Sequence, residues 1–315
     1  MHLLRRDVPQ QAGERAVQHD ETPNVDPVAV GLVGSGPWAA TMHGPVLASG
    51  PETRLTAVWA RRPEAATELA ATLGTTAANS YEDLLDRCEA VAFAVPPDVQ
   101  AALAIRAAKA GKALLLEKPL ALNLDDARRL ADAVDNAGVI SQVVLTKRYH
   151  PRTRAFLTAA QDFPAIGARA SYLHGAFLGG PFATGWRMTY GALYDLGPHL
   201  LDLADAALGP IADLTARGDS RRWIELTCQH EDGAVSQLSL SGAVGLPSSR
   251  AGIEIFGATG AMSLDFATVD HAECWPIMRA EFAAAVRTRT PHSLDIRRGM
   301  LLQELLSRAV CRATE

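Results

Sequence analysis

The feature that most constrains the fold of this chain is the alternation of short apolar runs with longer amphipathic stretches in its first half. The short runs are partly β-branched, which is typical of strands buried on both faces of a parallel sheet; they cover residues 28–33, 55–59, 90–95, 113–116 and 141–145. Stretches with helical spacing separate them, over residues 62–73, 98–110 and 124–137. This order predicts the α/β fold class, with a doubly wound parallel sheet in the first half.

A glycine-rich turn follows the first predicted strand and precedes a helical stretch. Its residues form a GxGxxA pattern: Gly34, Ser35, Gly36, Pro37, Trp38 and Ala39. Glycines let the backbone approach a pyrophosphate closely, and the free N–H groups of the following helix favour negative charge. Because the strand and the helix supply the context that this pattern requires, the sequence predicts a dinucleotide-binding turn. An ordinary tight turn is the alternative.

The end of the second predicted strand favours one nucleotide over the other. Sites for NAD(H) place an Asp or Glu there to bind the ribose hydroxyls. This chain has Ala60, Arg61 and Arg62 instead, and forked guanidinium donors suit a 2′-phosphate. NADP(H) is therefore the preferred cofactor, and NAD(H) remains possible. The alternative is that both arginines are solvated charges at the start of a helix.

Two polar motifs carry the predicted chemistry. Lys118 follows the fourth predicted strand, where ligands of open α/β sheets bind, so its ammonium can hold a substrate oxygen or pass it a proton. In the second half, the stretch DLGPHLLD places Asp195 four residues before His199, which predicts that both project from one helix face and form a hydrogen bond. Such a carboxylate would raise the pKa of the imidazole toward neutrality, as proton transfer to and from an alkoxide requires.

Pro198 complicates this second motif, because it removes a backbone donor and disfavours a regular helix. The helix can then begin afresh at Gly197, with Asp195 as an N-terminal cap and His199 as a core histidine. Asp202 is assigned to packing or to a supporting contact. Structural roles are assigned to three histidines without a partner at ligand spacing: His43, His150 and His174.

The second half has a different pattern. Strand-like runs with Gly-bearing turns between several of them favour antiparallel neighbours; they cover residues 168–177, 222–229, 234–242, 251–257 and 261–266. We therefore predict a disordered tail over residues 1–26, a dinucleotide-binding domain over 27–147, and an α+β domain for substrate binding and oligomerisation over 148–315. Since helices are expected on one side of the second sheet only, a second subunit should cover the other, which predicts a homodimer or homotetramer.

Composition argues against several classes of partner. The 315 residues carry a formal net charge of −5, without the basic surplus that a nucleic-acid or membrane-surface partner requires. The four cysteines are scattered, with neither a CxxC pair nor a His at metal-ligand spacing, which indicates reduced thiols in the cytoplasm and no metal site. No run reaches the roughly 18 apolar residues of a membrane helix, and the N-terminal stretch lacks the apolar segment of a signal peptide.

Several motifs, in order from residue 28 onward, resemble the Gfo/Idh/MocA oxidoreductase family: GSGPWA, VPP, GKALLLEKPLA, WRMTYGALYDLGPHLLDLA and EFAAAVRTRTPHSLD. The resemblance implies an N-terminal Rossmann domain, a C-terminal domain with a large, open, mostly antiparallel sheet, and hydride exchange between NAD(P) and a secondary alcohol or ketone of a sugar or cyclic polyol. It implies that His199 is the acid/base, that Asp195 orients it and that Lys118 polarises the substrate oxygen. Pro96 and Glu117 join the predicted cofactor contacts.

Two further pairs are candidates for substrate binding. Trp186 and Arg187 stand in a predicted Gly-rich loop and resemble a WR pair of the family's substrate loop. Lys147 and Arg148 end the last Rossmann strand and face the same crevice. Either pair could bind a hydroxylated or anionic substrate; packing and solvated charge are the alternatives. A nucleotide-binding sensor and a glycoside-cleaving enzyme that uses transient oxidation also stay open as functions.

Overall fold

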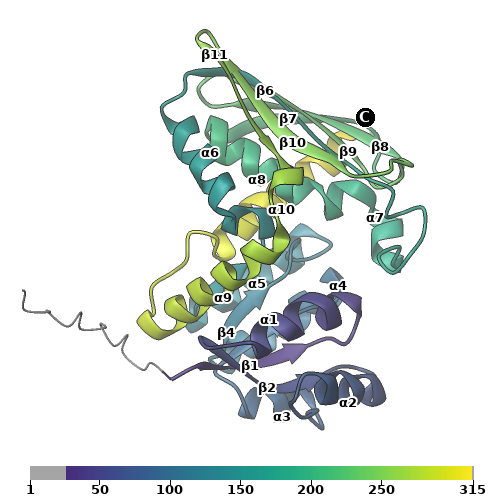
Figure 1. The fold of residues 1–315 in the computed structure, drawn as a ribbon, viewed down its shortest axis with the longest axis vertical. Coiled ribbons are helices and arrows are strands. Elements are labelled where there is room, and N and C mark those ends of the chain that lie inside the picture. Colours follow the sequence, from purple (N-terminus) through teal and green to yellow (C-terminus); the bar gives the residue numbers. More distant parts are fainter. Residues whose placement is uncertain (1–25, 314–315) are drawn as a thin grey trace, which may run out of the picture.

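Two β-sheets organise the chain into two lobes, as a computed structural model that describes residues 26–313 shows (Figure 1). The predicted N-terminal tail lies, apart from Asp26, outside the described residues. Among the residues described, no helix is both long enough and apolar enough to cross a bilayer.

The first sheet is five-stranded and parallel throughout, with the order β2-β1-β3-β4-β5. Its strands are β1 (Val28–Val33), β2 (Thr53–Trp59), β3 (Ala90–Phe93), β4 (Ala113–Leu116) and β5 (Ser141–Val143). The connecting helices are a π turn (Ala39–His43) with α1 (Gly44–Ala48), then α2 (Pro63–Thr72), α3 (Tyr81–Asp86), α4 (Pro97–Lys109) and α5 (Leu124–Ala137). Every residue of β1, β3, β4 and β5 is buried, which is why these strands are continuous apolar runs. The predicted doubly wound α/β fold is confirmed.

The strand order fixes where this sheet binds ligands. From β1 the chain moves outward to β2 and then returns to the other side of β1 to form β3. A crevice opens at such a switch point, outside the carboxyl ends of the two central strands. The glycine turn after β1 and the VPP segment after β3 therefore border one crevice.

The second sheet has six strands in the order β11-β10-β6-β9-β8-β7, and β6 with β9 is its one parallel pair within the described residues. Its strands are β6 (Ala165–Leu173), β7 (Ile211–Asp219), β8 (Trp223–His230), β9 (Val235–Ser241), β10 (Arg250–Gly257) and β11 (Gly260–Asp265). The sequence analysis missed β7. A register shift after Ile211 puts the buried residues of this strand at 211, 214 and 216, so its apolar positions do not alternate regularly.

Helices cover one face of the second sheet, as predicted (Figure 1). They are α6 (Pro151–Gln161), α8 (Gly197–Leu208) and α10 (Ile296–Ala313). The opposite face is open and carries mostly polar side chains at the centre of the sheet, such as Arg169, Gln237 and Thr227. The subunit expected to cover this face remains a prediction.

The helix α9 (His271–Thr288) returns from the second half of the sequence to the first lobe. Its Arg279 donates hydrogen bonds to the Glu52 carboxylate at 2.8 Å and to the Val46 carbonyl at 2.9 Å. Near its end, Arg287 forms an ion pair with Glu89. These contacts fix α9 to the first lobe.

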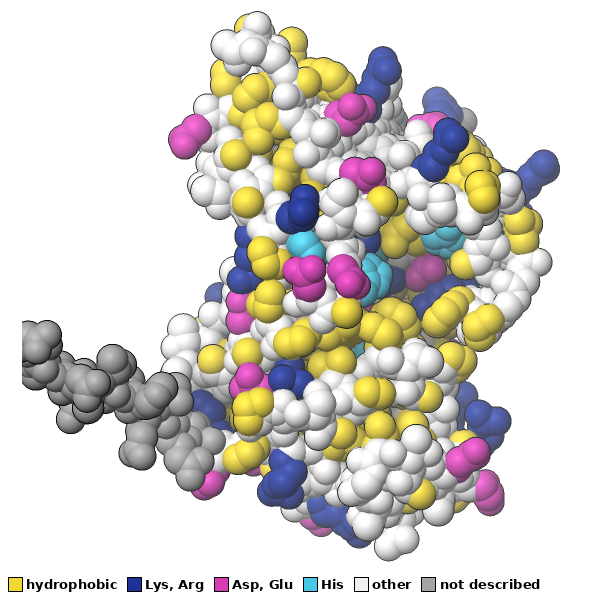
Figure 2. All heavy atoms as spheres, viewed as in Figure 1, with side chains coloured by type: hydrophobic (Ala, Val, Ile, Leu, Met, Phe, Trp, Pro, Cys, Tyr) yellow, Lys and Arg dark blue, Asp and Glu magenta, His cyan; other side chains and the backbone are white. Residues whose placement is uncertain are grey.

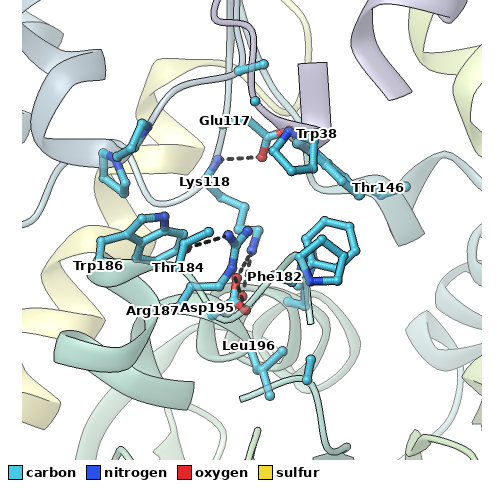
Figure 3. Close-up of a pocket in the computed structure, with 18 of the residues that line it drawn as sticks. Trp38, Glu117, Lys118, Thr146, Phe182, Thr184, Trp186, Arg187, Asp195 and Leu196 are labelled. Carbon is cyan, nitrogen blue, oxygen red and sulfur yellow. Dashed lines mark hydrogen bonds and ion pairs between the residues drawn. The ribbon is translucent and has the colours of Figure 1, made fainter. Parts of the chain in front are cut away.

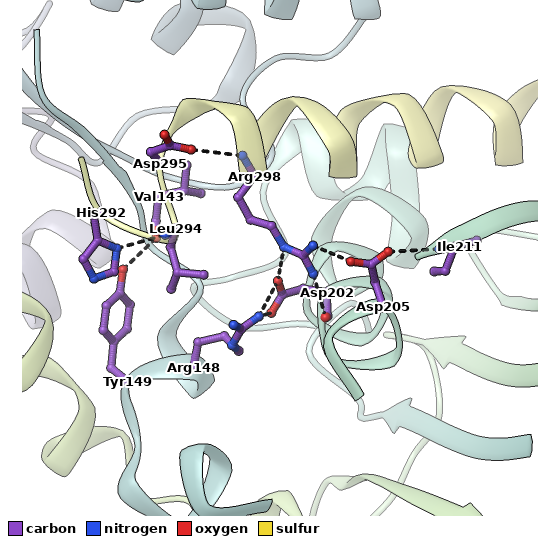
Figure 4. A network of polar contacts seen from close by, with 10 residues as sticks. All are labelled: Val143, Arg148, Tyr149, Asp202, Asp205, Ile211, His292, Leu294, Asp295 and Arg298. Atoms are coloured by element: carbon purple, nitrogen blue, oxygen red, sulfur yellow. Dashed lines mark hydrogen bonds and ion pairs between the residues drawn. The ribbon is translucent and has the colours of Figure 1, made fainter. Parts of the chain in front are cut away.

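A buried ionic network joins the lobes from within (Figure 4). The Asp202 side chain is 1% exposed and accepts hydrogen bonds from Arg148 Nη1 at 2.8 and 2.9 Å and from Arg298 Nε at 2.7 Å. Arg298 also pairs with Asp205, which accepts the Ile211 N–H at 3.0 Å. The last segment of the first lobe is thereby tied to α8 and α10.

Removal of the central carboxylate should destabilise the protein strongly. We expect Asp202→Ala to lower the free energy of unfolding by about 3–5 kcal/mol, because the largely buried Arg148 would lose its carboxylate partner and Arg298 would lose one of its two. Urea denaturation measures this. The matched control is Arg128→Ala, which removes an exposed ion pair with Asp125 and should leave the unfolding midpoint unchanged. Equal effects of the two substitutions would contradict the role given to the network.

Candidate active site

A cavity of about 360 Å³ lies between the lobes. The ends of β1, β3 and β4 line it from the first lobe, while β6, α8 and α7 (Gly185–Asp195) line it from the second. Figure 2 shows a hollow at this waist, with histidine, acidic and basic side chains gathered along it. The crevice expected from the strand order thus belongs to an interlobe site.

The glycine turn has the geometry that a dinucleotide requires. Gly34 has φ +123°, and a Cβ atom there would lie 2.4 Å from the Ala94 carbonyl oxygen, so no other residue fits. A Cβ atom on Gly36 would meet nothing within 4 Å, which leaves open space beside the backbone. Gly36, Pro37, Trp38 and Pro96 line the cavity. These residues fit a pyrophosphate and the sugar next to it.

Glu117 connects this turn to the segment after β4 that carries Lys118. Its Oε1 accepts hydrogen bonds from Trp38 Nε1 and from His43 Nε2, both at 2.7 Å. Burial opposes ionisation of Glu117, but the hydrogen bond and charge of His43 and the charge of Lys118 outweigh burial and lower the pKa of this carboxyl. Glu117 was predicted to contact the cofactor. Glu117 lines the cavity, and its carboxylate binds Trp38 and His43, so His43 has a partner that the sequence analysis did not identify.

The residues predicted at the ribose end lie at the end of β2, outside the cavity lining. Arg61 and Arg62 are exposed, and neither forms a side-chain hydrogen bond or ion pair within residues 26–313. Arg62 stands at the N-cap of α2. Both guanidiniums are therefore available to a phosphate.

Lys118 and Asp195 form an ion pair across the cavity (Figure 3). The Lys118 ammonium donates to Asp195 Oδ1 at 3.0 Å and to the Asp195 carbonyl oxygen at 2.6 Å. Arg187 Nε donates to the other carboxylate oxygen at 3.1 Å. Burial opposes ionisation of Asp195, but these two cations lower the pKa of its carboxyl to about 2.

The predicted hydrogen bond between Asp195 and His199 is wrong. The helix α7 ends at Asp195 and α8 begins at Gly197, with Pro198 in its first turn, so the two side chains do not share one helix face. The alternative of Asp195 as an N-terminal cap is also wrong, because the N-cap of α8 is Leu196 and has no side-chain cap.

The predicted rise in the pKa of His199 is wrong as well. Burial lowers the pKa of His199 well below its usual value, and the charges of Lys118 and Lys147 lower it further. The attraction of Asp195 does not compensate, because Lys118 and Arg187 already neutralise that carboxylate. His199 lines the cavity as a neutral imidazole, a state that can accept a proton.

A break inside α7 sets the direction of the Asp195 segment. Gly191 has φ 71° and ψ −162°, and a Cβ atom there would lie 2.2 Å from the Ser220 carbonyl oxygen. Ser220 Oγ donates to the Tyr190 carbonyl at 2.7 Å and accepts the Leu193 N–H at 2.9 Å. The turn between β7 and β8 therefore holds the helix break that precedes Asp195.

Of the four residues predicted to bind substrate, three line the cavity and one does not. Trp186 and Arg187 line the cavity from the first turn of α7, not from a loop as predicted. Lys147 lines it as well. Arg148, the next residue, does not line the cavity, because its guanidinium is bound to Asp202 (Figure 4).

Among the lining residues that the sequence analysis did not assign to the site are Tyr172, His174 and His271. Tyr172 lies on β6, and inward-facing alternation along this strand is the signal that could have placed it. His174 follows the same strand, and burial lowers the pKa of its imidazole. His271 begins α9 and has no signal in the local sequence, since the fold of the whole chain brings it here.

Comparison with known proteins agrees with this architecture. Residues 28–145 match the description "Oxidoreductase family, NAD-binding Rossmann fold", and residues 167–263 match the "GFO/IDH/MocA C-terminal domain". The chain is 30% identical over 286 residues to dTDP-3,4-didehydro-2,6-dideoxy-alpha-D-glucose 3-reductase of Streptomyces violaceoruber, covering 84% of this chain and 79% of that protein. It is also 32% identical over 198 residues to D-apiose dehydrogenase of Paraburkholderia graminis, covering 58% of this chain and 48% of that protein.

Solved structures share the fold over nearly the whole chain. GenD2 from gentamicin A biosynthesis, in complex with NAD, has a TM-score of 0.83 at 23% identity, covering 98% of this chain and 97% of its own. Levoglucosan dehydrogenase, in complex with NADH and L-sorbose, has a TM-score of 0.82 at 18% identity, covering 91% and 97%. With both domains matched in order, the chain belongs to the Gfo/Idh/MocA family of NAD-binding oxidoreductases.

Proposed function

We propose that this protein is an NADP(H)-dependent oxidoreductase that exchanges a hydride with a secondary alcohol or ketone of a sugar or cyclic polyol. The observation that carries the proposal is the convergence of Lys118 from one lobe with Asp195 and His199 from the other, beside the glycine turn. A protein that only senses a nucleotide has no need of this polar group. The names of the relatives, a sugar reductase and a sugar dehydrogenase, support the substrate class.

The charge states of the site support a division of roles. His199, as a neutral imidazole, accepts the hydroxyl proton when an alcohol is oxidised. Two of the three N–H donors of Lys118 bind Asp195, and the third can donate to the substrate oxygen. Asp195 acts chiefly by fixing Lys118, since it makes no hydrogen bond with His199. When bound, the nicotinamide ring supplies the hydride chemistry at its C4 atom.

The preference for NADP(H) rests on the end of β2. Ala60 provides no carboxylate to repel a 2′-phosphate, and the free guanidiniums of Arg61 and Arg62 suit one. The glycine turn, with Pro96 across the switch point, would hold the pyrophosphate and its sugar. We further propose a cytoplasmic homo-oligomer that forms through the open face of the second sheet.

Loss of the base should affect chemistry and spare nucleotide binding. We expect His199→Gln, which keeps the volume and polarity of the side chain, to reduce kcat by about 100-fold or more, because a glutamine amide does not accept the proton. Nicotinamide absorbance with a panel of sugars and polyols measures turnover, and calorimetry measures NADP affinity as the control. An unchanged kcat would remove His199 from the mechanism.

The low pKa of His199 predicts an unusual pH profile. An ordinary histidine becomes protonated as the pH falls through about 6.5. Because the pKa of His199 is lower than this, His199 should stay deprotonated at that pH, and kcat/KM for alcohol oxidation should be flat from about pH 7 down to about pH 6. Steady-state rates at constant ionic strength test this. A decline with an apparent pKa near about 6.5 would show an unperturbed histidine and contradict the assignment.

Cofactor preference should depend on the arginine pair. We expect Arg61→Ala to raise the KM for NADP by about 10-fold, through loss of a charge-assisted hydrogen bond, and to leave the KM for NAD unchanged. The matched control is Arg54→Ala, which removes an exposed arginine at the other end of β2. Equal changes for NADP and NAD in Arg61→Ala would overturn the preference.

A further inference from the structure

Lys147 is a buried cation without a carboxylate partner among the described residues. It is 5% exposed, and its Nζ lies 3.2 Å from His271 Nε2. The same ammonium lies over two aromatic rings, 4.4 Å from the centroid of Phe266 and 5.6 Å from that of Tyr172. Aromatic faces and a neutral imidazole orient a cation, but they neutralise none of its charge. The cost of burying this ammonium is therefore not offset by the protein itself.

The other charges of the cavity are already paired. Asp195 is bound by both Lys118 and Arg187, and Glu117 accepts hydrogen bonds from His43 and Trp38. Burial lowers the pKa of His271 to about 4 and that of His174 as well, so these imidazoles are neutral near pH 7. Burial also lowers the pKa of Lys147, but only to about 8, so most of its population keeps the positive charge. The lining thus holds one uncompensated cation.

We propose that Lys147, oriented by His271, is a subsite for an oxyanion carried by the substrate, either a carboxylate or a phosphate. The inference rests on the proposed function and makes it more specific, because the substrate becomes an acidic sugar and not a neutral one. His271 Nε2 accepts one N–H of the ammonium, which leaves two donors for the oxyanion. Charge-assisted hydrogen bonds of this kind are the strong ones.

The position of Lys147 indicates where the oxyanion sits on the substrate. Tyr172 is a neighbour of both Lys147 and His199, with its ring 5.6 Å from Lys147 Nζ and 6.1 Å from the ring of His199. An anion on Lys147 is therefore one side chain away from the base at the reacting carbon. This places the charge on the sugar ring or its exocyclic carbon, and not on a distant nucleotide.

Binding measurements on the full-length protein with NADP test the subsite. Calorimetric titrations would compare uronates and hexose 6-phosphates with their parent hexoses. We expect at least one acid to bind about 10- to 100-fold more tightly than its parent sugar, the effect of one or two charge-assisted hydrogen bonds. Whether the uronate or the phosphate shows this gain identifies the source of the oxyanion.

Substitutions test whether the tighter binding of acids than of their parent sugars depends on Lys147. Lys147→Met should abolish the preference for acids without lowering the melting temperature, since it removes an unpaired buried charge; Lys147→Arg should keep part of the preference. Lys109→Met, at an exposed position on α4, is the matched control and should change neither quantity. A preference that survives in Lys147→Met, or no acid that binds more tightly than its parent sugar, would overturn the subsite.

Hydride transfer in the same samples separates this inference from the proposed function. Acids that bind through Lys147 without any nicotinamide turnover would support the subsite and overturn the oxidoreductase. Turnover of neutral sugars, with equal affinity for the acids, would support the oxidoreductase and overturn the subsite.

Discussion

The ion pair between Lys118 and Asp195 is the interaction on which the interlobe site depends. It joins the end of β4 to the end of α7, and its side chains are only 13% and 11% exposed. Burial and the charges of Lys118 and Lys147 outweigh the attraction of Asp195, so the pKa of His199 lies well below its usual value and the imidazole is neutral. The charge state of His199 is thus a consequence of the contact between the lobes.

The buried charges of the protein are of two kinds, paired and unpaired. Asp202 and Asp205 are surrounded by Arg148 and Arg298, so the joint between the lobes is a closed network that favours one relative placement. In the cavity, the Lys147 ammonium has no counterion among residues 26–313. A network in which each buried charge has a partner stabilises the fold. A buried charge without a partner lowers the stability of the fold, and a ligand that neutralises it can restore that stability.

The sequence predicted the first sheet well, because strands buried on both faces are continuous apolar runs. It missed β7, where a register shift disrupts the alternation of buried positions. The spacing of Asp195 and His199 predicted one helix face, and Pro198 alone was the signal that a break separates them. Lys147 and Arg148 are adjacent in the sequence, yet one lines the cavity and the other binds Asp202. The packing of α8 and α10, which the local sequence does not reveal, decides which of the two lines the cavity and which binds Asp202.

The central claim is that Lys118 and His199 act on the same substrate oxygen, and a double-mutant cycle tests it most directly. The rate of hydride transfer would be measured for Lys118→Ala, His199→Ala and the double variant under single-turnover conditions. Residues that act as a unit are strongly non-additive, so the double variant should be little slower than the slower single variant. Additive losses would contradict the claim, because they would show two groups that act independently.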